Sequence, residues 1–83
     1  MAFSKFRYHR NAEEGLTALL ARGEEVFNEL KKVIRNVLSG WEPEDKDHAQ
    51  LVVVFHDYFL NFTVAQGDKS CLVLAAVVPK PRI

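Results

Sequence analysis

Cysteine, proline and glycine are all scarce in this 83-residue chain, which has one, three and four of them respectively. The single cysteine, Cys71, cannot form an internal disulfide, so the chain is not a disulfide-stapled secreted scaffold. We expect Cys71 to be a small core residue. Few prolines and glycines, together with 48% hydrophobic and 27% charged residues, exclude a collagen-like repeat and a disordered linker. The length predicts one domain, residues 1–83, with a modest core.

Long hydrophobic runs are also lacking. The longest run, residues 71–78, is too short to span a bilayer, and no hydrophobic segment follows Met1 as in a signal peptide. We therefore expect a cytoplasmic protein that has no membrane partner.

The chain has no excess of charge of either sign, with eleven basic and eleven acidic residues. Most proteins that hold nucleic acid by its phosphates carry a basic excess, so this balance argues mildly against that role. The distribution is uneven, because residues 1–10 contain three bases and no acid, whereas residues 42–47 contain four acids and one base. Lys80 and Arg82 add two bases near the C-terminus. A basic patch from both termini requires that the fold bring them together.

Residues 3–40 have the pattern of a short strand followed by two helices. Residues 3–8 alternate aromatic and polar side chains, which predicts a strand with one half-exposed face. Asn11 is the predicted N-cap of a first helix of about ten residues, which Gly23 ends. A second helix is predicted over 24–40, because its apolar residues recur with the 3.6-residue period and share one wide face.

From Gln50 onward the period changes to 2 and the composition becomes β-branched and aromatic. Strands are predicted at 51–55, 58–64 and 71–78, and the last is expected in the centre of the sheet because both of its faces are apolar. The resulting order, β-α-α-β-β-β, predicts an α+β fold with two helices packed on one face of a small, mostly antiparallel sheet. The predicted core consists of Leu16, Leu20, Phe27, Leu30, Ile34, Val37, Val53, Phe55, Leu60, Phe62, Leu72 and Leu74.

No motif in the residues themselves specifies a reaction. The chain has no phosphate-cradling glycine loop and no nucleophile elbow. The three histidines, His9, His48 and His56, have neither helical spacing nor cysteine companions, so we expect no metal and no cofactor. The acidic run at 42–47 lacks the glycine and closing glutamate of a calcium loop and is interpreted as a solvated connector.

The succession of segments nevertheless resembles that of a known family. The residues that carry the resemblance are a short strand that ends in an aromatic, then "NAEEGLTALLARG", "EEVFNELKKVIRNVLSG" and "WEP", and later "LVVVFHDYFLNFTV" and "LVLAAVV". Over residues 6–78 this order resembles the RelE/ParE superfamily of toxins from type II toxin–antitoxin systems. The "HDYFLNF" segment stands where members commonly carry a Gly-Asp-Tyr-Arg type turn.

The resemblance implies a small bacterial toxin that a cognate antitoxin protein neutralises. RelE-type members cleave mRNA on the ribosome without a metal, using basic side chains and often a C-terminal tyrosine. Cations there stabilise the phosphorane, and a proton-transfer group serves the 2′-oxygen. ParE-type members instead inhibit DNA gyrase.

Three departures from the family pattern argue against the full RNase residue set. Phe59 follows Tyr58 where arginine is usual, the connector at 42–47 is acidic, and the printed sequence ends at Ile83 without a terminal tyrosine. Each departure removes a cation or a proton-transfer group. A ParE-like or catalytically silent member fits the sequence better than an mRNA endonuclease.

The candidate site residues fall into two groups. Tyr58, His56 and Arg82 are weak candidates for a catalytic role, the first two as proton-transfer groups and the third as a cation. The candidate binding residues are Lys5, Arg7, Arg10, Phe59 and Lys80. For each of them the alternative is a solvated surface residue or, for Tyr58, a half-buried strand residue.

The sheet face opposite the helices is expected to stay partly apolar, because 83 residues supply no third layer to cover it. An antitoxin segment or a second copy of the chain is the expected cover. Two functions therefore stay open. The first is a toxin that acts on gyrase or on the ribosome and its mRNA. The second is a non-catalytic interaction or regulatory module of α+β fold.

Overall fold

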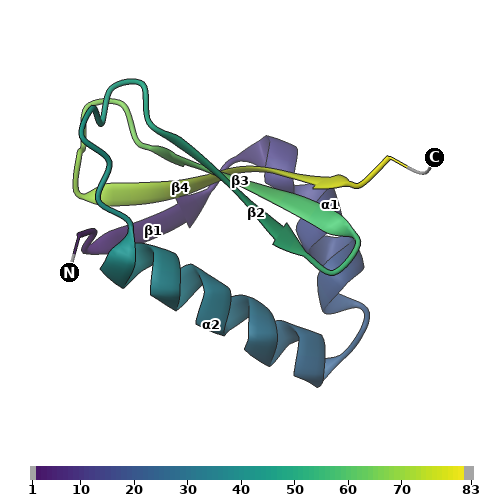
Figure 1. The fold of residues 1–83 in the computed structure, drawn as a ribbon. Coiled ribbons are helices and arrows are strands. Elements are labelled where there is room, and N and C mark those ends of the chain that lie inside the picture. Colours follow the sequence, from purple (N-terminus) through teal and green to yellow (C-terminus); the bar gives the residue numbers. More distant parts are fainter. Residues whose placement is uncertain (1, 82–83) are drawn as a thin grey trace.

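The two helices and four strands occur in the predicted order. A computed structural model of the chain describes residues 2–81 (Figure 1). Its elements are β1 (Lys5–Tyr8), α1 (Arg10–Leu20), α2 (Glu24–Gly40), β2 (Gln50–Phe55), β3 (Tyr58–Val64) and β4 (Cys71–Pro79). The α+β class and the order β-α-α-β-β-β are thus confirmed, and the predicted bounds of α2 and β3 agree with those observed.

The four strands form one mixed sheet in the order β1-β4-β3-β2. The pairs β2–β3 and β3–β4 are antiparallel, as expected for strands joined by short turns, whereas β1 runs parallel to β4. The strand β4 lies between two neighbours, which confirms its predicted central position. It is also where the N-terminal strand meets the C-terminal half of the chain.

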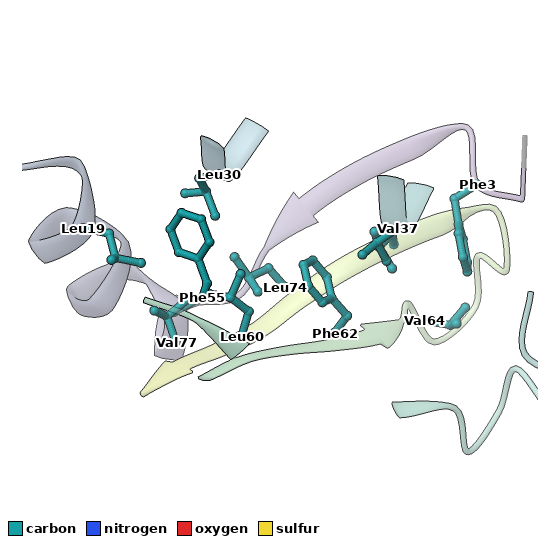
Figure 2. Close-up of a cluster of buried hydrophobic side chains, with 12 residues drawn as sticks. Phe3, Leu19, Leu30, Val37, Phe55, Leu60, Phe62, Val64, Leu74 and Val77 are labelled. Atoms are coloured by element: carbon teal, nitrogen blue, oxygen red, sulfur yellow. The ribbon is translucent and has the colours of Figure 1, made fainter. Parts of the chain in front are cut away.

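Both helices contribute to a single core on one face of the sheet. Side chains from α1, α2, β2, β3 and β4 converge there (Figure 2). Strand alternation explains which sheet residues take part, because Leu60, Phe62 and Val64 of β3 are buried and their neighbours are half-buried. The buried core consists of Phe3, Ala12, Leu19, Leu30, Val37, Phe55, Leu60, Phe62, Val64, Leu72, Leu74 and Val77.

Most of the predicted core is confirmed, but two of its members are exposed. Leu20 and Phe27 are 43% and 41% exposed. Both lie beside the turn at Gly23 that joins α1 to α2, where they line a shallow surface pocket. The helical period placed both on the apolar faces of their helices, but their side chains lie at the surface of this corner. Leu16, Ile34 and Val53 are partly buried and pack against the core.

The start of α1 also differs from the prediction. The N-cap is His9, and not Asn11, and the helix begins at Arg10. The His9 ring nitrogen Nδ1 accepts a hydrogen bond from the backbone N–H of Asn11 at 3.1 Å. An unprotonated imidazole nitrogen can therefore replace the side-chain oxygen that usually caps a helix.

The N-terminal segment before β1 is tied to the end of α2. Phe3 is 1% exposed, and its backbone N–H donates to the carbonyl of Leu38. Its ring lies 5.8 Å from that of Trp41, which is partly buried and packs against the core. Cys71 is likewise buried, in agreement with its expected role as a small core residue.

Candidate functional site

The sheet face that points away from the helices, which we name the open face, carries the candidate site. Arg7, Val73, Thr63 and Gln50 are paired in register across β1, β4, β3 and β2, so they form one row across this face. A second row, nearer the β2–β3 hairpin, consists of Val78, Phe59 and Val54. The two rows differ in character, one polar and basic, the other apolar.

The polar row forms the floor of a groove of about 590 Å³. The end of β1 and the connector before β2 contribute to its lining, together with the last residues of β3 and the turn after it. Its lining residues are Arg7, His9, Asp47, His48, Ala49, Gln50, Thr63, Val64, Ala65, Gln66 and Val73. Parts of the chain that are far apart in the sequence therefore meet at one end of the open face.

Arg7 is the fixed positive charge of the groove. Among the salt bridges of residues 2–81, none involves Arg7. The neighbouring open-face cation of β1, Lys5, is instead 2.8 Å from Asp68 through its Nζ and the carboxylate Oδ2. Arg7 is thus the β1 cation that is available to an anion in the groove.

Two histidines of the groove are each held through Nδ1. His9 uses Nδ1 to cap α1, and Nδ1 of His48 lies 2.9 Å from Oδ2 of Asp45. The hydrogen bond and charge of Asp45 raise the pKa of His48 above its ordinary value, so its cationic form is favoured. Because Nδ1 is engaged in both rings, Nε2 is the nitrogen that each can offer to a ligand.

Acidic and uncharged polar groups complete the groove. Asp47 lines it and lies 3.7 Å from Nζ of Lys69. Gln50, Thr63 and Gln66 supply amide and hydroxyl groups, while Ala65 and Val73 form buried apolar floor. Such a mixture can hold an anion at Arg7 and the imidazoles, and imidazoles can also transfer a proton.

The other end of the open face is apolar and exposed. Val52, Val54 and Val78 are 55%, 56% and 47% exposed. Phe59 is half-buried between Val54 and Val78, with Nζ of Lys80 5.9 Å from its ring centroid. We name Val52, Val54, Phe59 and Val78 the apolar strip.

Between the two ends stands a polar atom without a partner. Asn61 pairs with Val52 on one side and Ala76 on the other. Its Oδ1 is buried and makes no hydrogen bond within the described residues. A buried acceptor of this kind is uncommon in native proteins.

The structure separates the predicted site residues into three places. Lys5 and Arg7 lie on the open face of β1, with Arg10 at the start of α1. Phe59 and Lys80 lie together at the opposite end of β4. The parallel pairing of β1 with β4 places Lys5 opposite Cys71, whereas Lys80 follows the other end of that strand, so Lys5 and Lys80 lie at opposite ends of β4 and share no patch (Figure 1).

Tyr58 and His56 belong to the third place, the β2–β3 hairpin, where they contact the helices. Arg22 forms two hydrogen bonds with Asp57, of 2.6 and 3.0 Å, and its guanidinium lies 5.3 Å from the Tyr58 ring centroid. Nε2 of His56 lies 2.9 Å from a carboxylate oxygen of Glu29. These contacts anchor the hairpin to α2 and to the turn between α1 and α2. Arg82 lies outside the described residues.

Sequence reasoning did not identify His9, His48, Gln50 or Thr63 as members of a site. Period-2 alternation in each strand would place Arg7, Thr63 and Gln50 on one face, but their alignment depends on strand order and register. The contribution of His48 depends on the path of the connector. His9 is the exception, because it directly follows the predicted strand 3–8 and its place at the end of that strand could be inferred from the sequence.

Two further features of residues 2–81 bear on function. No group of three or more His, Cys, Asp or Glu side chains is arranged to hold a metal ion in this part of the chain. None of its helices has both the length and the apolar character needed to cross a membrane. Comparison with protein-family models gives no match, and comparison with curated proteins gives none either.

Proposed function

We propose that this chain is the toxin-like component of a type II toxin–antitoxin pair and that it contacts its target through the open face. The observation that carries the proposal is the uncovered sheet face, with a cationic groove at one end and an apolar strip at the other. The observed element order, which is also that of the RelE/ParE superfamily, supports the same proposal.

The antitoxin is proposed to cover the open face. Burial of exposed apolar side chains contributes about 25 cal/mol per Å² before the costs of association. Val52, Val54 and Val78 offer such area at the hairpin end. An acidic segment that continued along the sheet would reach Arg7 in the groove, so one extended peptide could neutralise both ends.

DNA gyrase and the ribosome with its mRNA are the proposed targets, and the chain is proposed to lack the full RNase residue set of the family. Tyr58 lies under Arg22, and His56 is held by Glu29. Those two residues serve the anchoring of the hairpin, which supports a role that does not depend on them for chemistry.

A non-catalytic interaction or regulatory module is the second candidate. The apolar strip favours it, because an exposed patch of this kind marks a protein-interaction surface whether or not the protein is toxic.

Inducible expression in a bacterial host tests the toxin proposal. We expect growth arrest on induction of the wild-type chain and recovery on co-expression of the neighbouring reading frame. The variant Arg7→Gln combined with Val52→Lys tests whether the open face is responsible. It alters both ends of that face and should relieve the arrest. Harmless accumulation of folded wild-type protein would support the interaction module instead.

A further inference from the structure

The groove of the open face combines features that suit one kind of small ligand. It contains a cation at Arg7 and two imidazoles, from His9 and His48, on opposite walls formed by the end of β1 and by the connector. A single arginine on a strand is ordinary surface chemistry. Arg7 and His48 can both be cationic, and the His9 ring adds a neutral N–H donor while it caps α1, so two separate segments supply three anion-binding groups to one cavity.

Within residues 2–81, the hydrogen bonds of the two imidazoles leave the same ring nitrogen, Nε2, without a partner in each. The Nδ1 atoms of His9 and His48 are engaged by the Asn11 N–H and the Asp45 carboxylate, respectively. Their Nε2 atoms are therefore the ring nitrogens left to donate to an acceptor, once they carry a proton. Phosphate oxygens are acceptors that match one guanidinium fork and two such donors.

The volume and the remaining lining exceed what a bare phosphate requires. The groove measures about 590 Å³, which lies within the usual range of small-molecule sites of about 300–1,000 Å³. Gln50, Thr63 and Gln66 add neutral donors and acceptors, and Val73 and Ala65 provide apolar floor. These groups suit a polar organic moiety attached to the phosphate.

We propose that this groove binds a phosphate monoester, with the phosphate held by Arg7, His9 and His48 and an attached polar group held by Gln50, Thr63 and Gln66. The attached group is a nucleoside or a sugar, and the experiment distinguishes the two sources. Asp47, which also lines the groove, disfavours a second negative group at the connector wall and so favours a ligand with one charged end. The inference goes beyond the proposed function and does not depend on it.

NMR titration of the purified chain tests the proposal with AMP, UMP and ribose 5-phosphate as probes. Inorganic phosphate and adenosine are the two half-ligand controls. We expect saturable shifts in the ring signals of His9 and His48 and in the backbone signals of residues 47–50, 63–66 and 73. The His56 ring is an internal control, because Glu29 holds it on the other side of the sheet.

We expect at least one monoester to bind about tenfold more tightly than either half-ligand. Preference for the nucleotides or for ribose 5-phosphate identifies the source.

Variants then locate the site. Arg7→Gln should weaken binding by about tenfold or more. His9→Asn should weaken it as well, while asparagine retains the α1 cap that an alanine would remove. Arg35→Gln on α2 removes the same charge away from the groove and should leave affinity unchanged. Inorganic phosphate that binds as tightly as every monoester, no shift at His9 and His48, or equal weakening by Arg35→Gln would each overturn the proposal. Growth arrest is measured separately, so failure here leaves the toxin proposal standing.

Discussion

At the residue scale, His9 is placed where two functions meet. Its Nδ1 caps α1, and the same ring lines the groove. The capping bond needs an unprotonated Nδ1, so a proton on His9 at neutral pH belongs on Nε2, which can face a ligand. The consequence is that loss of the ring at this position has both a structural and a binding effect, which only a capping replacement such as asparagine separates.

Asp68 is the residue for which we predict the clearest dependence of stability on pH. Hydrogen bonds from Lys5 and from Ser70 hold the pKa of this carboxyl far below its ordinary value of 3.8. Its contribution to the free energy of unfolding is therefore complete above pH 3.8 and is lost as the pH falls toward the folded-state pKa. Urea unfolding from pH 5 to pH 2 should show a steeper loss for the wild type than for Asp68→Asn.

Asp47→Asn is the matched control for that measurement. Asp47 is also an exposed aspartate near a lysine, but its nearest lysine nitrogen lies 3.7 Å away. The wild-type slope should persist in this variant. Equal slopes in Asp68→Asn and the wild type would contradict the prediction.

Some single residues could not be predicted from the sequence because their environment is set by tertiary contacts. Phe3 precedes the first strand, yet it is buried because its backbone hydrogen-bonds to the end of α2 and its ring packs on Trp41. Phe27 lies on the apolar face of α2, yet it is 41% exposed and lines surface pockets with Leu20 and with Phe6. Periodicity indicates a face of an element, but not how far the covering element extends.

At the element scale, the packing of α1 on β4 is set by Gly15. A Cβ atom at this position would meet the backbone carbonyl oxygen of Val77 and lie 2.6 Å from its Cγ1. Helix and strand backbones can therefore approach each other closely here. By propensity alone a glycine inside a helix only weakens it slightly, whereas here the absent side chain of Gly15 is what lets the helix dock.

We predict that Gly15→Ala destabilises the protein although alanine is the better helix former. The gain in helix propensity is about 1 kcal/mol, whereas overpacking a rigid contact costs about 1–3 kcal/mol. Because the clash includes backbone, which cannot rotate away, the cost should exceed the gain. The free energy of unfolding in urea should fall by about 1 kcal/mol.

Gly40→Ala is the control for this substitution. It places the same methyl group at the C-terminal end of α2, where no other atom lies within 4 Å. This variant should be neutral or slightly stabilised. A stability gain in Gly15→Ala equal to that in Gly40→Ala would show that the α1–β4 contact yields easily.

The elements themselves were largely predictable because local patterns determine them. The change from period 3.6 to period 2 near residue 50 separates α2 from β2 as observed. The strands predicted at 51–55 and 58–64 leave two residues between them, and the structure has a two-residue turn there, at His56 and Asp57, with His56 at φ 53°. The parallel β1–β4 pair joins opposite ends of the chain, and the sequence predicted only a mostly antiparallel sheet.

At the scale of the whole molecule, the open face has a polar end and an apolar end, and strand order produces both. The alignment of Arg7, Thr63 and Gln50 in one row requires the order β1-β4-β3-β2 and its register. Neither is encoded in a local pattern, so the sequence predicted an uncovered apolar face but not the groove. The cationic residues that the sequence suggested for a site do not lie together in the structure, because strand order and register were not known.

The edge strand β2 gives this face a means of self-association. Over residues 2–81, β2 pairs only with β3, so alternate residues of β2 direct their backbone N–H and C=O groups to a free edge. Its six residues, QLVVVF, contain no charge and no proline, the features that usually protect an edge from pairing with another chain. Val52 and Val54 extend the apolar surface to this edge.

We predict that the purified wild-type chain self-associates through β2 and the apolar strip. Sedimentation velocity over a range of micromolar concentrations should show a concentration-dependent dimer or larger species. Val52→Lys should shift the population to monomer, because a charge on an edge strand is costly to bury opposite a second copy. Phe59→Asp should act in the same direction and also weaken binding of an antitoxin, while the core on the other sheet face keeps the monomer folded.

Leu20→Lys is the matched control, since Leu20 is 43% exposed but lies on the helical side, and it should leave association unchanged. A wild-type chain that sediments as a monomer at the highest concentration would contradict this prediction. So would an equal response to Leu20→Lys, because association would then involve the helical surface and not the open face.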